Sequence, residues 1–290
     1  RDFFALCWSK THLREWAGRE DERIRRYEEI LRRYPFDKIL IWNGNFEYQR
    51  GFISTVRKLG LESALSYVEV GWLDQSNSVY VDPTGINAAS TLATKAPPPI
   101  TRQQADELAD FLTAYRAPHV AGKDKTDIAG HDTPTVLVPL QVDTDSNILL
   151  HSPFDSMADF ISYLEGWIPP GYRVILRPHP KAKYGYAIQS CRSDFEVRTE
   201  GDIKAAVLSA DLVIGINTTV LIQALALGKP TVAFGKGVFS ASKAVLPMQL
   251  GEPFTRPQWD EDAVEQLLYH LVFRRQIWIE PEPCQVQVDR

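Results

Sequence analysis

The second half of the chain alternates short apolar runs with segments of helical periodicity, and this pattern restricts its fold more than any other feature. Each apolar run predicts a buried strand, and the segments between the runs space their apolar residues as amphipathic helices do. We expect strands at 135–140, 173–176, 212–216 and 231–234 and helices at 156–164, 202–208 and 219–227. Strands that alternate with helices in this way indicate an α/β domain on a parallel sheet. Ligands of such sheets bind outside the carboxyl ends of the strands.

The first half repeats the alternation less clearly. We expect strands at 3–8, 38–42 and 65–70 and helices at 20–34 and 52–59, which again predicts a parallel sheet. Residues 74–100 carry no regular pattern, and a further helix is expected at 103–115. Residues 117–133 are the most loop-like stretch, so we place the boundary between two α/β domains there: 1–130, and 131–290 with a terminal helix at 260–273 and a tail.

The charge balance and the cysteines bear on several classes of function. A net charge of −5 and an isoelectric point near 5.7 argue against a nucleic-acid partner, because a phosphate backbone is usually met by a basic surface. Cys7, Cys191 and Cys284 are widely spaced, which is typical of a reducing compartment, and we expect a cytoplasmic protein. The basic stretch 23–33 is either a solvated helix face or a patch that touches an anionic membrane.

Residues 177–181 read Arg-Pro-His-Pro-Lys and follow a predicted strand directly. The two prolines fix φ and stiffen the loop, so Arg177, His179 and Lys181 are held with little freedom. A guanidinium fork, an imidazole N–H and an ammonium group all suit a phosphate. The loop therefore predicts an anion site, and the alternative is a solvated basic loop whose prolines only shape a turn.

Asn217, Thr218 and Thr219 stand between the strand at 212–216 and the helix that follows it. Backbone N–H groups at a helix start, together with hydroxyl side chains, can bind an anion. The alternative is that Asn217 or Thr218 is an N-cap residue, and the two roles are compatible. The sequence contains no GxGxxG after a strand and no P-loop, so neither a dinucleotide fingerprint nor a Walker motif is present.

Carboxylates follow two further predicted strands. Gln141, Asp143 and Asp145 come directly after the strand at 135–140, and two carboxylates this close can act as nucleophile, base or metal ligands. The alternative is a turn with local Asx hydrogen bonds. Glu69 ends an otherwise apolar strand, where desolvation would raise its pKa as a general acid requires. The competing interpretation of Glu69 is an edge-strand residue that faces water.

Aromatic residues and one histidine are weaker candidates. Trp42, Tyr48, Trp72 and Tyr80 could stack on a glycan, but core packing explains them equally well. His151 is a lone histidine whose role, chemical or structural, the sequence leaves open.

Taken in order, the motifs between about residues 40 and 240 resemble those of the bacterial capsule polysaccharide synthesis family. The resemblance rests on Glu69 to Leu73, Asp82 to Ile86, Val138 to Asp145, Arg177 to Lys181, and Asn217 to Thr219 with Ala224 to Thr231. That family contains the retaining β-Kdo transferases of capsule, O-antigen and lipopolysaccharide assembly, which are similar to GT-B glycosyltransferases. The resemblance implies two Rossmann-like domains that face each other across a cleft, with the acceptor on 1–130 and the donor, CMP-β-Kdo, on 131–290.

The resemblance also implies roles for the carboxylates. Asp145 would be the nucleophilic or otherwise essential aspartate, and Glu69 the acid/base. The family usually has Glu where this chain has Asp143, which makes Asp143 the weaker catalytic candidate. Asp82, Asp143 and His151 are secondary candidates for chemistry or acceptor binding.

The donor-binding residues that the resemblance implies share the strand-end loops of the second domain: Gln141, Arg177, His179, Lys181, Asn217, Thr218 and Thr219. CMP leaves as an anion, and cations beside a helix N-terminus would stabilise it without a metal. We therefore expect no metal and no other cofactor, although Asp143-Thr144-Asp145 has the DxD spelling of metal-dependent transferases.

The leading hypothesis is a glycosyltransferase that moves Kdo with retention to an oligosaccharide or glycolipid acceptor of a bacterial surface polysaccharide. Two alternatives stay open: a GT-B transferase with a UDP- or GDP-sugar donor, and a non-catalytic binding domain of a polysaccharide assembly complex. A binding domain does not need Glu69 and Asp145 on the same side of the molecule, and an enzyme does. The expected partners include no nucleic acid, and they allow peripheral contact with the inner membrane or with other assembly enzymes.

Overall fold

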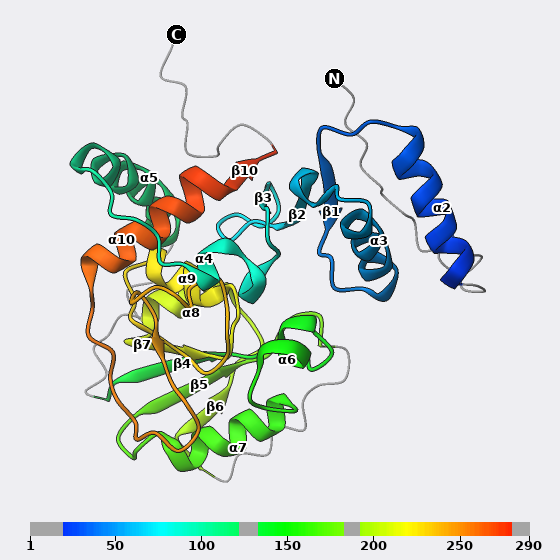
Figure 1. Cartoon of the computed structure of the whole chain (residues 1–290). Helices are drawn as coiled ribbons and strands as arrows, with labels where there is room; N and C mark the ends of the chain where they lie inside the picture. The colour runs from blue at the N-terminus through cyan, green and yellow to red at the C-terminus, as the bar shows by residue number, and fades with distance from the viewer. Residues whose placement is uncertain (1–19, 122–132, 183–191, 280–290) are drawn as a thin grey trace.

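The computed structural model describes residues 20–121, 133–182 and 192–279, so the strand expected at 3–8 lies outside the described residues. Within them the chain forms two sheets, each with helices packed against it (Figure 1). The first sheet has the strand order β1-β2-β3-β10, and the second has the order β6-β5-β4-β7-β8-β9.

The second sheet is parallel throughout and contains the four strands that the apolar runs predict. Its strands are β4 (Thr135–Pro139), β5 (Arg173–Arg177), β6 (Phe195–Val197), β7 (Leu212–Gly215), β8 (Thr231–Ala233) and β9 (Leu246–Pro247). The three predicted helices are α7 (Met157–Trp167), α8 (Ile203–Ser209) and α9 (Val220–Ala226). The sequence does not indicate α6 (Ser146–His151), β6 or β9, because segments this short hold too few residues to show a period.

Strand β4 shows why an apolar run predicts a buried strand here. Val136, Leu137 and Val138 are each 0% exposed. Leu137 belongs to one core cluster, and its two neighbours belong to another on the opposite face of the sheet. Successive side chains of a strand point to opposite faces, so a strand that is covered on both faces is apolar at every position.

The first sheet is mixed, because it adds to the two predicted parallel strands a third that runs antiparallel. As expected, β1 (Ile39–Trp42) and β2 (Leu65–Val70) are parallel and joined through α3 (Glu47–Lys58) and η1 (Glu62–Ala64). β3 (Ser78–Asp82) then returns antiparallel to β2 from within the stretch that carries no regular pattern. Its two end residues are polar yet buried, which hides the strand from a pattern of apolar residues.

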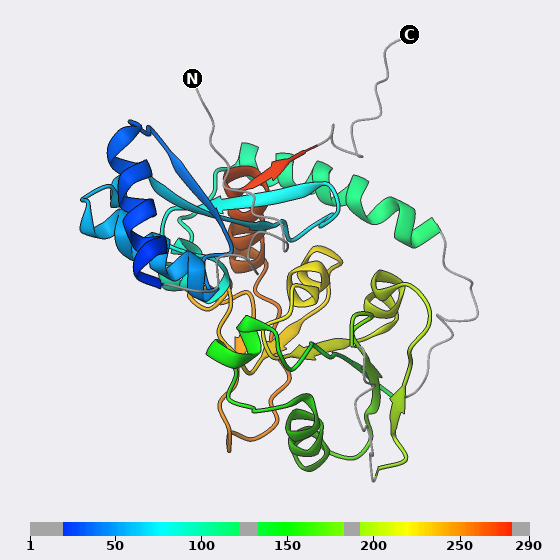
Figure 2. The same ribbon diagram turned by 90° about the vertical axis from the view of Figure 1, so that its right-hand side faces the viewer.

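The C-terminal segment returns to the first sheet. α5 (Arg102–Ala121) packs against α10 (Glu261–Tyr269), and α10 continues through the π-helical η3 (His270–Arg275) into β10 (Gln276–Trp278). β10 pairs antiparallel with β3, beside which it lies in Figure 2. The domain boundary at residue 130 stays a prediction. Residues 276–278, which follow that boundary in the chain, belong to the first sheet.

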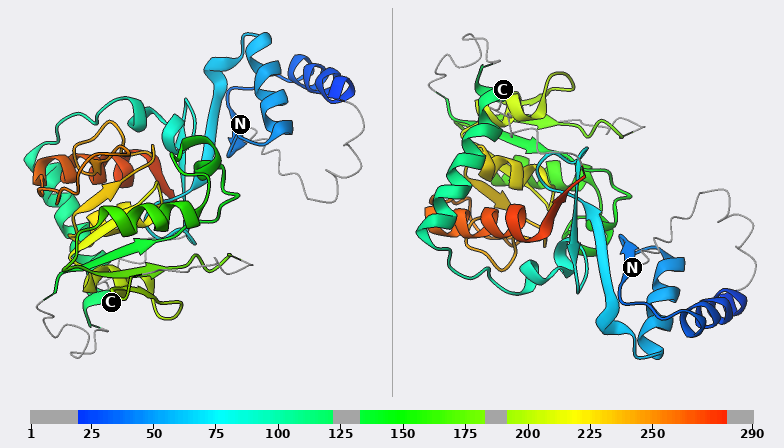
Figure 3. Two further views of the ribbon diagram at one scale, coloured as in Figure 1. Left: turned by 90° about the horizontal axis from the view of Figure 1, so that it is seen from below. Right: turned by 90° about the horizontal axis from the view of Figure 1, so that it is seen from above.

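The expected helix at 20–34 is α2 (Glu20–Arg33), which lies with α3 at the end of the molecule away from α10 (Figure 3). Arg23 of α2 pairs with Glu47 of α3 at 3.8 Å, while the contact of this basic stretch with a membrane stays a prediction. Among the helices of the described residues, none combines the length and the apolarity needed to cross a membrane.

Candidate functional site

The candidate site lies where the parallel strands of the second sheet end. β4 and β5 stay paired up to Pro139 and Arg177, after which Leu140 N–H donates to Arg177 O at 2.8 Å. The ends of β7 and β8 stay together in the same way, since Gly235 N–H donates to Ile216 O at 2.9 Å. The loops after β4, β5, β7 and β8 therefore leave the sheet at one edge, as a parallel sheet requires.

The side chain of Asn217 joins three of these loops. Gln141 Nε2 donates to Asn217 Oδ1 at 2.9 Å, and Asn217 N–H donates back to Gln141 Oε1 at 3.2 Å. Asn217 Nδ2 donates to the carbonyls of Asn147 (2.9 Å) and Lys236 (3.2 Å). The donor and the acceptor of the Asn217 amide are thus used within the protein. Gln141 and Asn217 thus position the loops, and the donor contact expected of them stays a prediction.

Thr218 and Thr219 are half-buried at the start of α9. Thr218 Oγ1 accepts a local hydrogen bond from Val220 N–H at 3.3 Å. Thr219 is the N-cap residue, and its side chain makes no capping bond. Of the two threonine hydroxyls in this turn, that of Thr219 does not cap the helix.

The two aspartates of the loop after β4 cap two different helices. Asp145 is the N-cap residue of α6, and its Oδ1 accepts from Asn147 N–H at 2.8 Å. Asp143 Oδ1 accepts from Met157 N–H at 2.7 Å, at the start of α7. Among the described residues no group of three or more His, Cys, Asp or Glu side chains could hold a metal ion. Whether a metal takes part stays open, and Asp143 has a structural task in either case.

Glu69 comes to the same place from the other sheet. Its Oε2 accepts from Asn43 Nδ2 at 2.7 Å, and its Oε1 accepts from Val70 N–H at 3.0 Å. Burial raises the pKa of Glu69, these two hydrogen bonds oppose the rise, and the negative charge of Asp145 adds to it. The charge of Asp145 thus acts on Glu69 from the other sheet, and α6, which Asp145 caps, packs against η2 (Asn87–Ala89) of the first half of the chain. Glu69 is half-buried and hydrogen-bonded, not a water-facing edge residue.

His179 is the third member of this group. Burial lowers the pKa of His179 and the charge of Lys181 lowers it further, while the charge of Asp145 opposes both. Lys181 N–H donates to His179 Nδ1 at 3.1 Å, so the neutral ring carries its proton on Nε2. His179 is therefore a neutral N–H donor beside Asp145, and Lys181 is an exposed cation next to it.

Arg177 does not lie as the sequence predicts. Its Nη1 donates to the carbonyls of Arg198 (3.2 Å) and Glu200, and its Nη2 donates to the carbonyl of Gly201. The guanidinium fork braces the segment after β6, so in this structure Arg177 supports the loop and is not directed at a phosphate.

His151 ends α6 against the loop after β8. Its carbonyl accepts from Lys236 N–H at 3.0 Å, and a Cβ at Gly235 would come within 2.8 Å of the same carbonyl. Burial, followed by the charge of Lys236, lowers the pKa of the His151 ring. His151 thus belongs to the same edge, where only glycine at position 235 allows α6 to approach β8.

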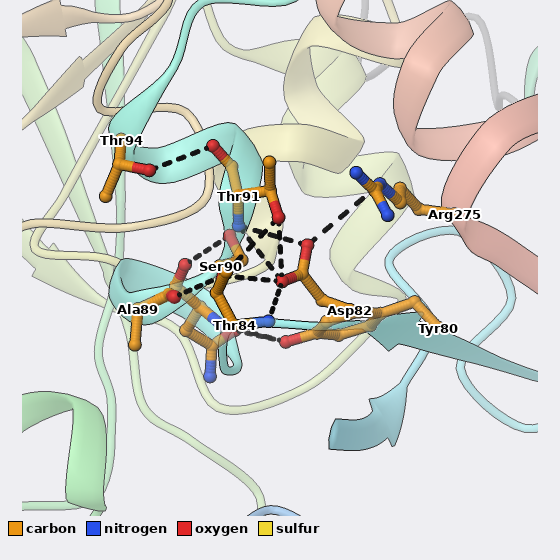
Figure 4. A network of polar contacts seen from close by, with 9 residues as sticks. Tyr80, Asp82, Thr84, Ala89, Ser90, Thr91, Thr94 and Arg275 are labelled. Atoms are coloured by element: carbon orange, nitrogen blue, oxygen red, sulfur yellow. Dashed lines mark hydrogen bonds and ion pairs between the residues drawn. The ribbon is translucent and has the colours of Figure 1, made fainter. Parts of the chain in front are cut away.

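Asp82, a secondary candidate for chemistry or acceptor binding, is a buried carboxylate with a structural role. It is 2% exposed and is surrounded by donors (Figure 4). Thr84 donates its N–H (2.9 Å) and hydroxyl (2.7 Å), and Thr91 donates its hydroxyl (3.0 Å) and an N–H shared between both oxygens (3.0 and 3.1 Å). Arg275 Nε lies 4.0 Å from Asp82 Oδ2. The carboxylate therefore ties β3 to α4 (Thr91–Thr94) and to η3.

The aromatic candidates divide by burial. Trp72 and Tyr80 stack with ring centroids 4.0 Å apart and belong to the core, so neither can contact a glycan. Trp42 is 48% exposed at the end of β1, and Tyr48 is half-buried in a stack with Phe46. Trp42 and Tyr48 therefore stay candidates for contact with the acceptor glycan.

Asn43 is a site residue that the sequence interpretation missed. It follows β1 with φ 65°, which few residues other than glycine adopt, and holds Glu69 in place. The signal is Asn-Gly-Asn directly after an apolar strand, the same strand-end rule that selected Asp145.

Asn43→Gly should raise the pKa of Glu69 further, because it removes a donor that stabilises the ionised carboxylate while glycine keeps the backbone conformation. A carbon NMR titration of the Glu69 carboxyl measures the change. Asn77→Gly is the control: it removes a side-chain amide that donates to Asp74 and not to Glu69, so the pKa of Glu69 should not change. An unchanged or lowered pKa in Asn43→Gly would show that the contact does not stabilise the ionised form.

Comparison with known sequences matches residues 107–245 to the family described as capsule polysaccharide biosynthesis protein. Protein FixF of Sinorhizobium fredii (strain NBRC 101917 / NGR234) is 26% identical over 226 residues, which are 76% of this chain and 54% of FixF. The chain thus spans about half the length of that relative.

Two solved structures share the fold. The β-Kdo 2,7 transferase of KpsC from Thermosulfurimonas dismutans has a TM-score of 0.63 at 15% identity, over 96% of this chain and 92% of that one. The β-Kdo 2,4 transferase of the same KpsC has a TM-score of 0.58 at 17% identity, over 80% and 78%. The GT-B-like α/β fold is therefore confirmed, and residues 107–245 are similar to the capsule polysaccharide biosynthesis proteins.

Proposed function

We propose that this chain is a retaining glycosyltransferase that moves Kdo from CMP-β-Kdo to an acceptor of a bacterial surface polysaccharide. The observation that carries the proposal is that η2 (Asn87–Ala89), in the first half of the chain, packs against α6, the helix that Asp145 caps, and that the charge of Asp145 acts on both Glu69 and His179. A non-catalytic binding domain has no need of such a pair. The choice of Kdo is supported by the motif resemblance and by the two KpsC transferases that share the fold.

In the first step Asp145 attacks the anomeric carbon of the donor. A bond forms between the carboxylate oxygen and that carbon, and the bond from the carbon to the phosphate oxygen breaks with its electron pair leaving on CMP. The product is a glycosyl ester of Asp145. As the N-cap residue of α6, Asp145 accepts a backbone N–H at Oδ1 (2.8 Å), which holds the carboxylate in place.

The departing phosphate gains negative charge, and the loops after β5 and β7 supply donors for it. His179 offers a neutral Nε2–H, Lys181 a positive charge, and Thr219 a hydroxyl at the start of α9. Donors that are already in place favour the transition state, because they need not reorganise as charge develops. Arg177, Gln141 and Asn217 act by holding these loops.

In the second step an acceptor hydroxyl attacks the same carbon from the side that CMP has left, and the ester bond to Asp145 breaks. Glu69 takes the proton of that hydroxyl. Two successive inversions give net retention, as in retaining glycosidases. A raised pKa suits Glu69 to this task, because it makes the carboxylate a stronger base.

CMP should raise the melting temperature of the protein by about 5 °C when present at about 100 times its Kd, whereas UDP and GDP should not. His179→Ala should remove most of that shift by deleting a phosphate donor. His270→Ala, a half-buried histidine that bonds Pro98 O instead, should keep it. A rise in melting temperature with UDP or GDP but not with CMP would indicate a GT-B transferase with a UDP- or GDP-sugar donor. No shift with any nucleotide, together with no product from CMP-Kdo, would overturn it.

A further inference from the structure

A pocket opens in the first domain next to Glu69. It has a volume of about 340 Å³ and lies between the end of β1, one side of α3 and the segment after β3. Its lining residues are Asn43, Gly44, Asn45, Arg50, Ile53, Ser54, Arg57, Tyr67, Thr84, Gly85, Ile86 and Ala89. The volume is at the lower end of the range for small-ligand sites, which suits about one sugar unit.

The charge in this pocket has one sign. Among the described residues that line it, Arg50 and Arg57 are the only charged ones, in a chain whose net charge is −5. Arg57 Nε bonds Glu62 Oε1 at 2.9 Å, whereas the Arg50 side chain has no hydrogen bond or ion pair with any described residue. Asn43, Asn45 and Ser54 add neutral polar groups. Guanidinium groups bind oxyanions, and amides and hydroxyls suit sugar hydroxyls.

Two glycines allow the walls of the pocket to pack closely. A Cβ at Gly44 would lie 2.7 Å from Tyr67 Cδ1, and the φ of Gly44 is +89°, which favours glycine. A Cβ at Gly85 would lie 2.7 Å from Ala89 Cβ and 2.9 Å from its carbonyl oxygen. Both walls of the pocket therefore depend on residues without a side chain.

Asn43 connects the pocket to the reacting groups. It lines the pocket and donates to Glu69 Oε2 at 2.7 Å. On the other side, η2 (Asn87–Ala89), which includes the lining residue Ala89, packs against α6, the helix that Asp145 caps. A sugar in this pocket would have its hydroxyls beside Glu69.

We propose that this pocket is the acceptor subsite and that it selects an acceptor with an anionic group, which Arg50 binds with help from Arg57. The oxyanion is the carboxylate of an acidic sugar or the phosphate of a glycosyl phosphate. The assignment to the acceptor rests on the proposed function, whereas the binding of an anionic sugar does not.

The binding test uses calorimetry on the full chain with three probes: the methyl β-glycoside of Kdo, its methyl ester, and glucose 1-phosphate. The acid or the phosphate should bind at least about tenfold more tightly than the neutral ester, and Arg50→Gln should remove that preference. Lys58→Gln removes a cation of the same helix that pairs with Glu28 and does not line the pocket, so it should change nothing. Equal binding of acid and ester, or full binding by Arg50→Gln, would overturn the proposal. Which probe binds distinguishes carboxylate from phosphate.

A kinetic test then separates the two proposals. Arg50→Gln should raise the KM for an anionic acceptor by about 10- to 100-fold, with partial recovery in Arg50→Lys, and should leave unchanged the release of CMP without acceptor. A loss of acceptor-free CMP release in Arg50→Gln would place Arg50 in donor binding and overturn the subsite. If the wild type transfers nothing from CMP-Kdo, the proposed function fails, and calorimetry still decides whether the pocket binds an anion.

Discussion

Asp145→Asn should abolish sugar transfer, by at least about 10³-fold, while leaving the affinity for CMP unchanged. Asparagine caps a helix as well as aspartate, so the hydrogen bond to Asn147 N–H and the start of α6 are kept while the nucleophile is lost. Asp145→Ala would remove both the capping hydrogen bond and the nucleophile, so a loss of transfer could not be assigned to either one. The measurements are product formation by mass spectrometry and the thermal shift with CMP.

Asp143→Asn is the matched control, since it makes the same change two residues earlier. Asp143 accepts from Met157 N–H at the start of α7, a bond that asparagine can also accept, so transfer should persist. A Glu69→Gln variant should accumulate a chain heavier by one Kdo unit, because the ester forms on Asp145 but the acceptor hydroxyl is not deprotonated. Transfer by Asp145→Asn at the wild-type rate would exclude Asp145 as the nucleophile.

Asp82→Ala should lower the free energy of unfolding by about 3–5 kcal/mol, the largest effect on stability that we expect from one side chain. The substitution leaves the N–H groups of Thr84 and Thr91 without their acceptor and Arg275 without its ion pair. Thr91 belongs to α4 and Arg275 to the distant η3, so the substitution weakens the connections of β3 to both of them. Chemical denaturation followed by circular dichroism measures the change.

Asp110→Ala, at an exposed position of α5, should change the same free energy by less than about 0.5 kcal/mol. Asp82→Asn should fall between the two, since the amide oxygen still accepts but the charge facing Arg275 is gone. If Asp82→Ala unfolds within about 1 kcal/mol of the wild type, the network does not hold the first sheet as we infer.

The second sheet could be predicted from the sequence because its strands are buried on both faces. Val136, Leu137 and Val138 form an apolar run that needs no knowledge of the rest of the chain to be recognised. β3 could not be predicted in this way. Ser78 and Asp82 are polar residues that are buried because the residues just before and after the strand bond to them. The partners are the Leu73 and Asp74 carbonyls for Ser78, and the Thr84 and Thr91 donors for Asp82.

For the candidate site, the strand-end rule selected Asp145, His179 and Asn217, and a parallel sheet brings their loops to one edge. The rule says nothing about where each side chain points. Arg177 donates to backbone carbonyls and Asn217 to the neighbouring loops, so both support the site. The role of a polar side chain at a strand end thus depends on the partners within its reach.

The sequence by itself determined the features that depend on neighbouring residues. These are the α/β alternation, the stiff loop at 177–181 and the helix start near Thr219. Only the tertiary structure decided the features that join distant segments: Glu69 beside Asp145, the pocket of Arg50, and β10 in the first sheet. Gln276 accepts from Trp72 N–H at 3.0 Å across 204 positions of the chain. Local preferences act over a few residues, whereas such a contact exists only when the whole chain has taken one path.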